Sequence, residues 1–583
     1  MRIAVAAGPG GGGTLRTLAD DGTPAAPARA VPDLVAAIAE QERAAAPRWV
    51  WPSTARLYPR LLAAGVRVGR CHDLELVESL LLGHAGRHGE PRSVRAAWAR
   101  LRGEPVPPDR PPHEERPAQA SLFDDDAGRD AAADDDIEQV VAVHAAQRRA
   151  MAGLDGFALL AAAESAGALV AAELGHDGLP WSAEEHDALL TELLGPRPTG
   201  GLRPRRLQDL ADRISAAFNP SPAPAGGPAE HGPRPAPRVH VNPDSPAQVV
   251  KAFAAAGLPV PSTRAHVLKG LDHPAVPLLL EYKELSRLHT AHGWSWLDTW
   301  VSGGRFRPEY VVGGVVSGRW ATSGGGALQI PRVLRRAVVA DPGWSLVVAD
   351  AAQLEPRVLA ALAGDRAFAE AAAHGDLYAA LSDAFRDGGD GGRSARDKAK
   401  IALLSAMYGG GTAEAVQLLA VLRNRFPAAF EYVEAAAREG ERGGLVRSRL
   451  GRTCPPPSAG WRELTAAGEG DAPDPAAARA LRSRGRFTRN FVVQATAADW
   501  ALALLGSLRR RLAALSPADG GGRPHLVFFQ HDEVIVHTPA GLADDVAAAV
   551  RASADEARRL LFGDTPVVFP MEIAVVGRYS DAK

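Results

Sequence analysis

The sequence predicts an α/β protein of several packed units, and three features of its 583 residues support this. The apolar run at 344–349 has the character of a buried strand, and a helical pattern follows it. Two further apolar runs flank His531-Asp532-Glu533, which predicts a hairpin with this triplet at its tip. Apolar residues at 278–288 repeat with a period of 3.6, as in an amphipathic helix. A chain of this length exceeds a single core, so three or four units are expected.

Composition limits the class of protein. Apolar residues make up 46% and charged residues 23% of the chain, which is ordinary for a globular protein and excludes wholesale disorder. No run of about 18 uncharged apolar residues occurs, so no membrane-spanning segment is expected. Cys71 and Cys454 are the two cysteines, which fits a reducing compartment and excludes a disulfide scaffold or a cysteine zinc site. We therefore expect a cytoplasmic protein.

Two segments are typical of linkers. Residues 103–136 are Pro-rich and then acidic, and residues 219–238 hold seven prolines. They predict a front part (1–218) and a longer back part (239–583). In the front part we expect strands at 1–6 and 48–51 and helices at 74–82, 156–174 and 184–195. The glycine run at 8–13 lacks a following Gly-Lys-Ser/Thr, so it predicts a turn rather than a phosphate loop.

Carboxylates stand at the ends of apolar runs in the back part. Asp350 closes the run at 344–349, and Pro356 fits the first turn of the next helix. A helix-capping aspartate would explain Asp350 equally well. Asp532 and Glu533 are adjacent acids that repel one another in a tight turn, and a bound cation is one reason to tolerate them. A solvated turn is the alternative there.

A basic helix lies between these two segments. Arg396, Lys400, Leu404 and Tyr408 are each four residues apart and therefore share one helix face. Two cations, an apolar group and an aromatic ring match a nucleotide lying along the helix, with a solvated basic face as the alternative. Together the three segments suit phosphoryl transfer, in which two carboxylates hold two Mg²⁺ ions and a cationic helix binds a triphosphate.

These segments resemble the family A DNA polymerases, the bacterial polymerase I type. Asp350-Ala-Ala-Gln353-Leu-Glu355-Pro-Arg357 resembles the first palm motif, Asp-Tyr-Ser-Gln-Ile-Glu-Leu-Arg. Other matches follow in the order that the family requires: the thumb segment Leu278–Leu288, Ser317-Gly318-Arg319-Trp320 with Leu328–Pro331, the fingers helix from Arg396 to Tyr408-Gly409, the template helix Arg486-x3-Asn490-x3-Gln494, and His531-Asp532-Glu533 of the second palm motif. The resemblance covers about 239–583.

The resemblance implies a right-hand polymerase: an α/β fold with a helical thumb (about 240–310), a palm (311–365 and 495–583) and fingers (366–494). A small ribonuclease H-like domain of the exonuclease type is expected in front of it. The implied substrates are primer–template DNA and dNTPs, with two Mg²⁺ ions that Mn²⁺ could replace. We expect a monomer that needs no membrane and works in DNA repair or replication.

The family's site residues carry over by position. The metal ligands would be Asp350, Asp532 and the Ala351 carbonyl, with Glu533 nearby as a further catalytic residue. Nucleotide binding would involve Arg396, Lys400, Leu404, Tyr408, Gln353 and Glu355, with Lys400 as the acid for pyrophosphate departure and Glu355 excluding a 2′-hydroxyl. DNA contacts would come from Arg319, Arg486, Asn490, Gln494 and His531.

The sequence also departs from the family pattern. Leu404 replaces the aromatic residue that stacks on the incoming sugar, and Ala351-Ala352 replaces Tyr-Ser. Tyr378 stands where the fingers usually carry a phosphate-binding histidine. We still expect activity, because both metal aspartates and the Arg396/Lys400 pair remain.

The front part lacks the acids of a proofreading site. Residues 1–19 and 51–72 contain no carboxylate, and Asp73 opens a helix where the exonuclease fold uses it structurally. We therefore expect an inactive exonuclease-like domain. Three alternatives stay open: a single-subunit RNA polymerase, which Glu355 and Glu533 argue against; a decayed primer–template binding protein; and an active bifunctional exonuclease and polymerase.

Overall fold

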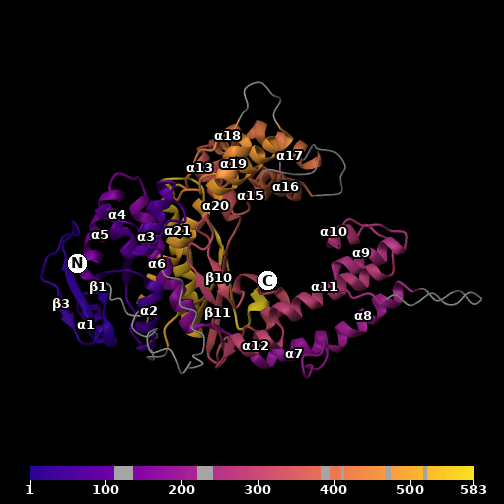
Figure 1. The fold of residues 1–583 in the computed structure, drawn as a ribbon, viewed down its shortest axis with the longest axis horizontal. Helices are drawn as coiled ribbons and strands as arrows, with labels where there is room; N and C mark the ends of the chain where they lie inside the picture. Colours follow the sequence, from indigo (N-terminus) through magenta and orange to yellow (C-terminus); the bar gives the residue numbers. More distant parts are fainter. Residues whose placement is uncertain are drawn as a thin grey trace, which may run out of the picture.

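The computed structural model describes residues 1–109, 136–219, 240–382, 394–408, 413–466, 474–515 and 522–582. Most of the predicted insertion at 103–136, nearly all of the linker at 219–238, and Gly409 lie outside these residues. Figure 1 shows the front part on one side, a sheet-containing centre, and two helical arms that extend from it. One arm contains α14 to α19 of the expected fingers, and the other contains α9 to α11 of the expected thumb together with α7 and α8.

The front part is built on a five-stranded sheet in the order β3-β2-β1-β4-β5. β1 pairs antiparallel with β2 and parallel with β4, so the sheet is mixed. The glycine run forms the connection between β1 and β2, and the predicted turn is confirmed. The elements are β1 (Arg2–Ala7), β2 (Gly13–Leu18), β3 (Arg29–Val31), β4 (Arg48–Trp51), β5 (Arg70–Asp73), α1 (Leu34–Ala45), α2 (Thr54–Ala63), α3 (Leu74–His84), α4 (Val94–Arg102) and α5 (Ile137–Met151).

Two long apolar helices form the centre of the molecule. α6 (Phe157–Asp177) lies between the front sheet and the rest of the chain, and α20 (Pro475–Ala514) packs against it. By length and composition both could cross a membrane, but 72% and 89% of their apolar windows are buried inside the protein. Packing in the core accounts for their apolar character.

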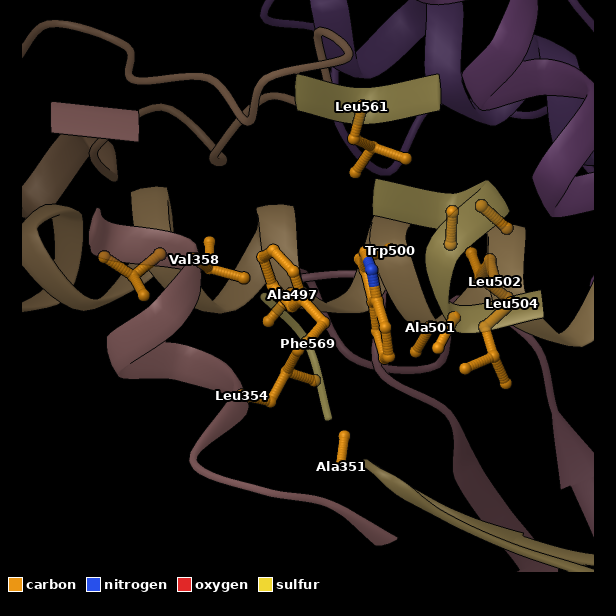
Figure 2. Close-up of a cluster of buried hydrophobic side chains, with 14 of the residues drawn as sticks. Ala351, Leu354, Val358, Ala497, Trp500, Ala501, Leu502, Leu504, Leu561 and Phe569 are labelled. Carbon is orange, nitrogen blue, oxygen red and sulfur yellow. The ribbon is translucent and has the colours of Figure 1, made fainter. Parts of the chain in front are cut away.

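The central sheet has the order β12-β13-β11-β14, and all its pairings are antiparallel. Side chains of β11 alternate between two cores, with Val347 and Ala349 in the core that contains α20 and α21 and with Leu346 and Val348 in the core on the thumb side. Figure 2 shows the first core, where Trp500 of α20 stacks on Phe569 at 5.4 Å between ring centroids. The elements are β11 (Trp344–Ala351), β12 (His525–Gln530), β13 (Glu533–Pro539), β14 (Met571–Val576) and α21 (Ala543–Phe562), with β9 (Glu309–Val311) and β10 (Ala321–Gly324) nearby.

The thumb begins earlier than the predicted domain boundary at 218. Leucines of α7 and α8, such as Leu190 and Leu210, share a core with Leu279 and Tyr282 of α11. Proline density suggested the boundary, but the leucine stripes decide which helices pack together. The elements are α7 (Ala183–Leu194), α8 (Arg205–Ala217), α9 (Pro246–Ala255), α10 (Ala265–Leu268), α11 (Ala275–His292), α12 (Trp294–Trp300), β6 (Leu179–Pro180), β7 (Val301–Ser302) and β8 (Arg305–Phe306).

The fingers are helical, as expected, but they share α20 with the palm. The predicted boundary at 494/495 falls inside this one continuous helix, whose first half packs on α18 and whose second half packs on α21. The elements are α13 (Leu354–Ala363), α14 (Arg366–Ala371), α15 (Leu377–Leu381), α16 (Ala395–Tyr408), α17 (Ala413–Arg425), α18 (Pro427–Glu441) and α19 (Ala459–Thr465).

A fully buried arginine, Arg357 of α13, joins palm and fingers. Its guanidinium donates hydrogen bonds of 2.6 to 3.1 Å to the carbonyls of Ala352, Val568, Ala372, His374 and Gly375. These carbonyls belong to three separate chain segments: the residue after β11, the segment after α14, and the segment before β14. A planar fork with five donors can satisfy them together, which the three donors of a lysine cannot.

We predict that Arg357→Lys lowers the free energy of unfolding by about 3 kcal/mol or more, because several buried carbonyls would lose their donors. Arg366→Lys is the matched control, because Arg366 is exposed on the adjacent helix and solvent screens its pair with Glu370. Urea unfolding of both variants measures the difference, and equal losses would contradict the role given to Arg357.

The front domain should lose stability in acid, because it buries two neutral histidines. Burial lowers the pKa of His72 to about 4 and that of His144 to about 2, and the two rings are 5.0 Å apart. Below the unfolded value of about 6.5 the unfolded chain takes up protons that the native state refuses, so stability falls as pH falls. The loss at pH 5 is about 2 kcal/mol for each histidine.

Hydrogen exchange of β1 and β4 amides in the full chain at pH 5.0 and 7.5, corrected for intrinsic rates, measures this loss. We expect His144→Leu to reduce the pH dependence by about one histidine's share. His266→Leu is the control, because His266 is exposed in the thumb helix α10. A pH dependence that His144→Leu leaves unchanged would contradict the prediction.

Candidate functional site

Two aspartates meet where the central sheet opens toward the helical arms. Asp350 is next to last in β11, and Asp532 lies in the two-residue turn between β12 and β13. The Ala351 amide donates to the Asp532 carbonyl at 3.0 Å, which holds the turn against the end of β11. His531 has a φ of 57°, and the Asp532 amide bonds the Gln530 carbonyl at 2.7 Å, so the turn is tight.

Glu533 is not at the hairpin tip, contrary to the prediction. It is the first residue of β13, directly opposite Asp350 in the ladder, and it is buried. Its carboxylate accepts a hydrogen bond from the Tyr579 hydroxyl near the C-terminal end. The turn contains two residues rather than three, so strand pairing places Glu533 in the sheet while Asp532 stays in the turn.

The electrostatics of the aspartates favour a cation. Burial, and after it the neighbouring Asp350 carboxylate, together raise the pKa of Asp532 to about 7. Within the described residues no group of three His, Cys, Asp or Glu side chains is arranged to hold a metal. Two carboxylates suit Mg²⁺, which proteins usually bind through one or two carboxylates, with water and substrate phosphates completing the shell. The residues present therefore fit a divalent metal whose ligands come partly from these carboxylates and partly from a substrate.

The basic helix α16 has the predicted face. Arg396 and Lys400 are exposed, Leu404 is half-buried, and Tyr408 at the helix end is exposed again. The Arg396 guanidinium pairs with Asp376 at 2.9 Å and lies 5.7 Å from the centroid of the Tyr378 ring. Tyr378 thus adds no charge at its position, but its ring stabilises the neighbouring Arg396 guanidinium through a cation–π contact.

Gln353 braces the start of the fingers. It has a left-handed φ of 55° just before α13, and its side-chain amide donates to Asp376 at 3.0 Å. Its side-chain carbonyl accepts from the Leu377 amide at 2.9 Å. The predicted nucleotide-binding residue is therefore engaged with the segment that also holds Arg396.

Glu355 forms the centre of a second cluster. Its carboxylate accepts hydrogen bonds from the Arg319 guanidinium and from the Tyr408 hydroxyl. The Gln494 side chain from α20 also bonds Tyr408, and the lowered pKa of His531 comes from burial and then from the nearby Arg319 charge. Residues predicted separately as nucleotide and DNA contacts thus meet at one place.

The template-helix residues lie along α20 ahead of this cluster. Arg486 is exposed and Asn490 is half-buried. The Asn490 carbonyl oxygen is buried and has no hydrogen-bond partner within the described residues. With Gln494, the three residues follow one another at four-residue steps, so the helix presents them on one side, as the spacing predicted.

Sequence analysis missed two buried charges behind this cluster. Glu164 of α6 and Arg452 of the loop after α18 form an ion pair of 2.6 Å with side chains 3% and 6% exposed. In the sequence, Gly451-Arg452 in an irregular stretch is the one sign of a special position. Its spacing does not indicate which residue pairs with Arg452. Residues so far apart in the chain meet only in the folded protein.

The comparisons with known proteins agree with this geometry. The model of "DNA polymerase family A" matches residues 238–575. The thermostable DNA polymerase I of Thermus thermophilus is 28% identical over 345 residues, which are 54% of this chain and 37% of that protein. DNA polymerase I of Chloroflexus aurantiacus is 28% identical over 321 residues, 50% of this chain and 31% of that protein. The chain thus spans about a third of the length of these curated relatives.

A solved structure extends the likeness to the front part. The polymerase domain of Pol1 from M. smegmatis, in complex with a DNA primer-template and dNTP, matches with a TM-score of 0.67 at 18% identity. The match covers 99% of this chain and 95% of that one. The predicted α/β right-hand fold with its small front domain is confirmed. Because the family model covers more than half of its residues, this chain belongs to DNA polymerase family A.

Proposed function

We propose that this chain is a template-directed DNA polymerase that adds deoxynucleotides to a primer 3′-hydroxyl. The observation that carries the proposal is the pairing of β11 with β13, which brings Asp350 and Asp532 together. They lie at the base of fingers whose α16 presents Arg396 and Lys400 on one face. Family membership supports the same reaction.

Asp350, Asp532 and the Ala351 carbonyl would hold two Mg²⁺ ions. The metal supplies activation of the attacking hydroxyl and neutralisation of charge on the phosphates. The pKa of Asp532 is raised first by burial and then by the Asp350 carboxylate, and a bound cation would offset both effects. In-line transfer needs little more than this positioning and charge compensation.

Arg396 and Lys400 bind the incoming triphosphate. Arg396 exchanges its Asp376 partner for phosphate oxygens, since both are anionic acceptors for the same guanidinium. Lys400 is exposed and, within the described residues, is in no ion pair, so its ammonium is available to donate a proton to the departing pyrophosphate.

Glu355 and Tyr408 select the sugar and the template base. Glu355 is held by Arg319 and Tyr408, so its carboxylate is fixed where a 2′-hydroxyl would collide with it. Arg319, Gln494 and His531 lie around the same cluster and contact the primer terminus and the nascent pair. Arg486 and Asn490 continue this contact along the template.

The proposed polymerase works without proofreading. β1 carries no acidic side chain, and the Asp73 carboxylate already accepts the Thr54 and Leu76 amides at 2.6 and 2.9 Å. Asp73 therefore caps a helix, as expected, and is not directed at a metal. We place the enzyme in the cytoplasm, as a monomer in DNA repair or replication.

We predict that the wild-type chain extends a recessed primer with dNTPs and Mg²⁺ or Mn²⁺, and that Asp350→Asn abolishes extension. Removing one carboxylate should cost at least about a thousandfold in rate, since the site then lacks half of its metal-binding charge. Asp544→Asn is the control, because Asp544 is exposed in the first turn of α21. A gel assay of labelled primer measures both.

Two outcomes would change the proposal. Binding of the primer–template without extension under either metal would leave a decayed binding protein, a reading that the altered Leu404 and Tyr378 positions would then explain. Shortening of the labelled 3′ end without nucleotides would mean that the front domain retains an exonuclease.

Leu404 should weaken nucleotide affinity and sugar discrimination, because it gives the incoming sugar no aromatic face. We predict that Leu404→Phe lowers the KM for dNTP and raises the preference for dNTP over rNTP, each by about tenfold, the effect of a contact worth about 1.4 kcal/mol. Leu404→Met is the control, since it keeps the volume without a ring. Single-nucleotide kinetics measure both parameters, and equal behaviour of the two variants would contradict the prediction.

A further inference from the structure

A buried ionic network joins α6, the loop after α18, and α20. Arg452 donates to Glu164 at 2.6 Å and to Asp499 at 2.8 Å, and Ser448 donates to Asp499 at 2.6 Å. The side chains of Arg452, Glu164 and Asp499 are 6%, 3% and 0% exposed. One guanidinium is thus fixed from two sides by carboxylates that come from different parts of the molecule.

The Arg452 guanidinium packs directly against the tight turn at 315–319. Gly318 has a φ of 85°, and a Cβ added there would lie 2.4 Å from the Arg452 Cζ and Nε atoms. The turn is closed by hydrogen bonds from the Gly318 amide to the Val315 carbonyl at 2.8 Å and from the Val315 amide to the Arg319 carbonyl at 3.1 Å. Any displacement of Arg452 therefore changes the surface on which this turn rests.

The same turn delivers Arg319 to the site. Arg319 follows Gly318 and reaches Glu355, while the next residue, Trp320, is buried against Phe529 with ring centroids 4.8 Å apart. Trp320 also packs close to Gly167 of α6, where an added Cβ would lie 3.4 Å from its ring. Glu164 and Gly167 are one helical turn apart, so a single stretch of α6 supports the turn through Arg452 and through Trp320.

We infer that Glu164 is a positioning residue for Arg319, and that α6 thereby aligns the primer-contacting side of the site. This inference rests on the proposed function. Without the Glu164 charge, Arg452 keeps only Asp499 as an anionic partner, and its guanidinium swings toward α20. The Val315–Arg319 turn then loses its packing contact with Arg452. As a result, Arg319 no longer binds Glu355 in one fixed orientation.

The helix offers a matched control for a merely structural role. Glu173 lies at the other end of α6 and is also buried, and it pairs with Arg509 of α20 at 2.7 and 2.9 Å. Its other partners are the Tyr58 hydroxyl and the Arg67 guanidinium of the front domain. Glu173→Gln therefore removes a comparable buried charge pair from the same helix, but these partners of Glu173 do not belong to the Gly318 turn.

The first experiment needs no activity. Hydrogen exchange of the DNA-free full chain should show faster exchange of the Val315 and Gly318 amides in Glu164→Gln than in the wild type. Glu173→Gln should leave these amides unchanged and instead speed exchange near Tyr58. Equal exchange at 315–319 in the wild type and Glu164→Gln would overturn the inference, whether or not the chain proves to be a polymerase.

The second experiment is a double-mutant cycle on primer extension with Glu164→Gln, Arg319→Ala and both together. We expect Glu164→Gln to lower kcat/KM by about tenfold to a hundredfold, Glu164→Asp to restore part of it, and Glu173→Gln to stay near the wild type. Because Glu164 acts through Arg319, adding Glu164→Gln to Arg319→Ala should cost little more.

Full additivity in the cycle, or an equal defect in Glu173→Gln, would overturn the inference. Absence of extension in the wild type would overturn the proposed function instead, and the exchange data would still decide whether Glu164 fixes the turn. Thermal unfolding of each variant separates a local effect from a general loss of stability.

Discussion

The register between β11 and β13 is the constraint on which the site depends. Asp350 stands opposite Glu533, and the Ala351 amide donates to the Asp532 carbonyl, so backbone pairing determines where both aspartates lie. A slip of one residue would turn Asp350 to the opposite face of the sheet, among apolar side chains. The apolar alternation along β11, which fills two different cores, prevents that slip.

Buried arginines hold the surrounding units to this sheet. Arg357 donates hydrogen bonds to carbonyls of the palm and the fingers. Arg452 lies between two carboxylates, and Arg509 of α20 donates a hydrogen bond to the front domain. Burying a guanidinium costs desolvation, and such groups give specificity of arrangement more than net stability. Each of these three has several fixed acceptors, so each defines how separate chain segments meet.

The departures at Leu404 and Tyr378 fall on the fingers side, and the departure at Ala351 leaves the end of β11 paired in the sheet. Tyr378 lies beneath Arg396, and Leu404 is half-buried on the α16 face, while the two aspartates keep their places. Contacts to the nucleotide can thus vary without disturbing the strand pairing that positions the carboxylates. This separation is consistent with an aspartate pair that persists beside altered positions in the fingers.

The sequence by itself determined the family, the order of the elements and the aspartates at the end of the central sheet. Local patterns suffice for these: apolar alternation in strands, four-residue steps in α16 and α20, and polar residues where strands end. Tertiary structure alone decided that Glu533 is buried against Tyr579, that α7 and α8 pack in the thumb, and that Arg452 meets Glu164. Arg452 and Glu164 are 288 residues apart, and no local period encodes a contact over that distance. Such contacts arise only when packed elements bring their faces together, because a buried charge must then find a partner.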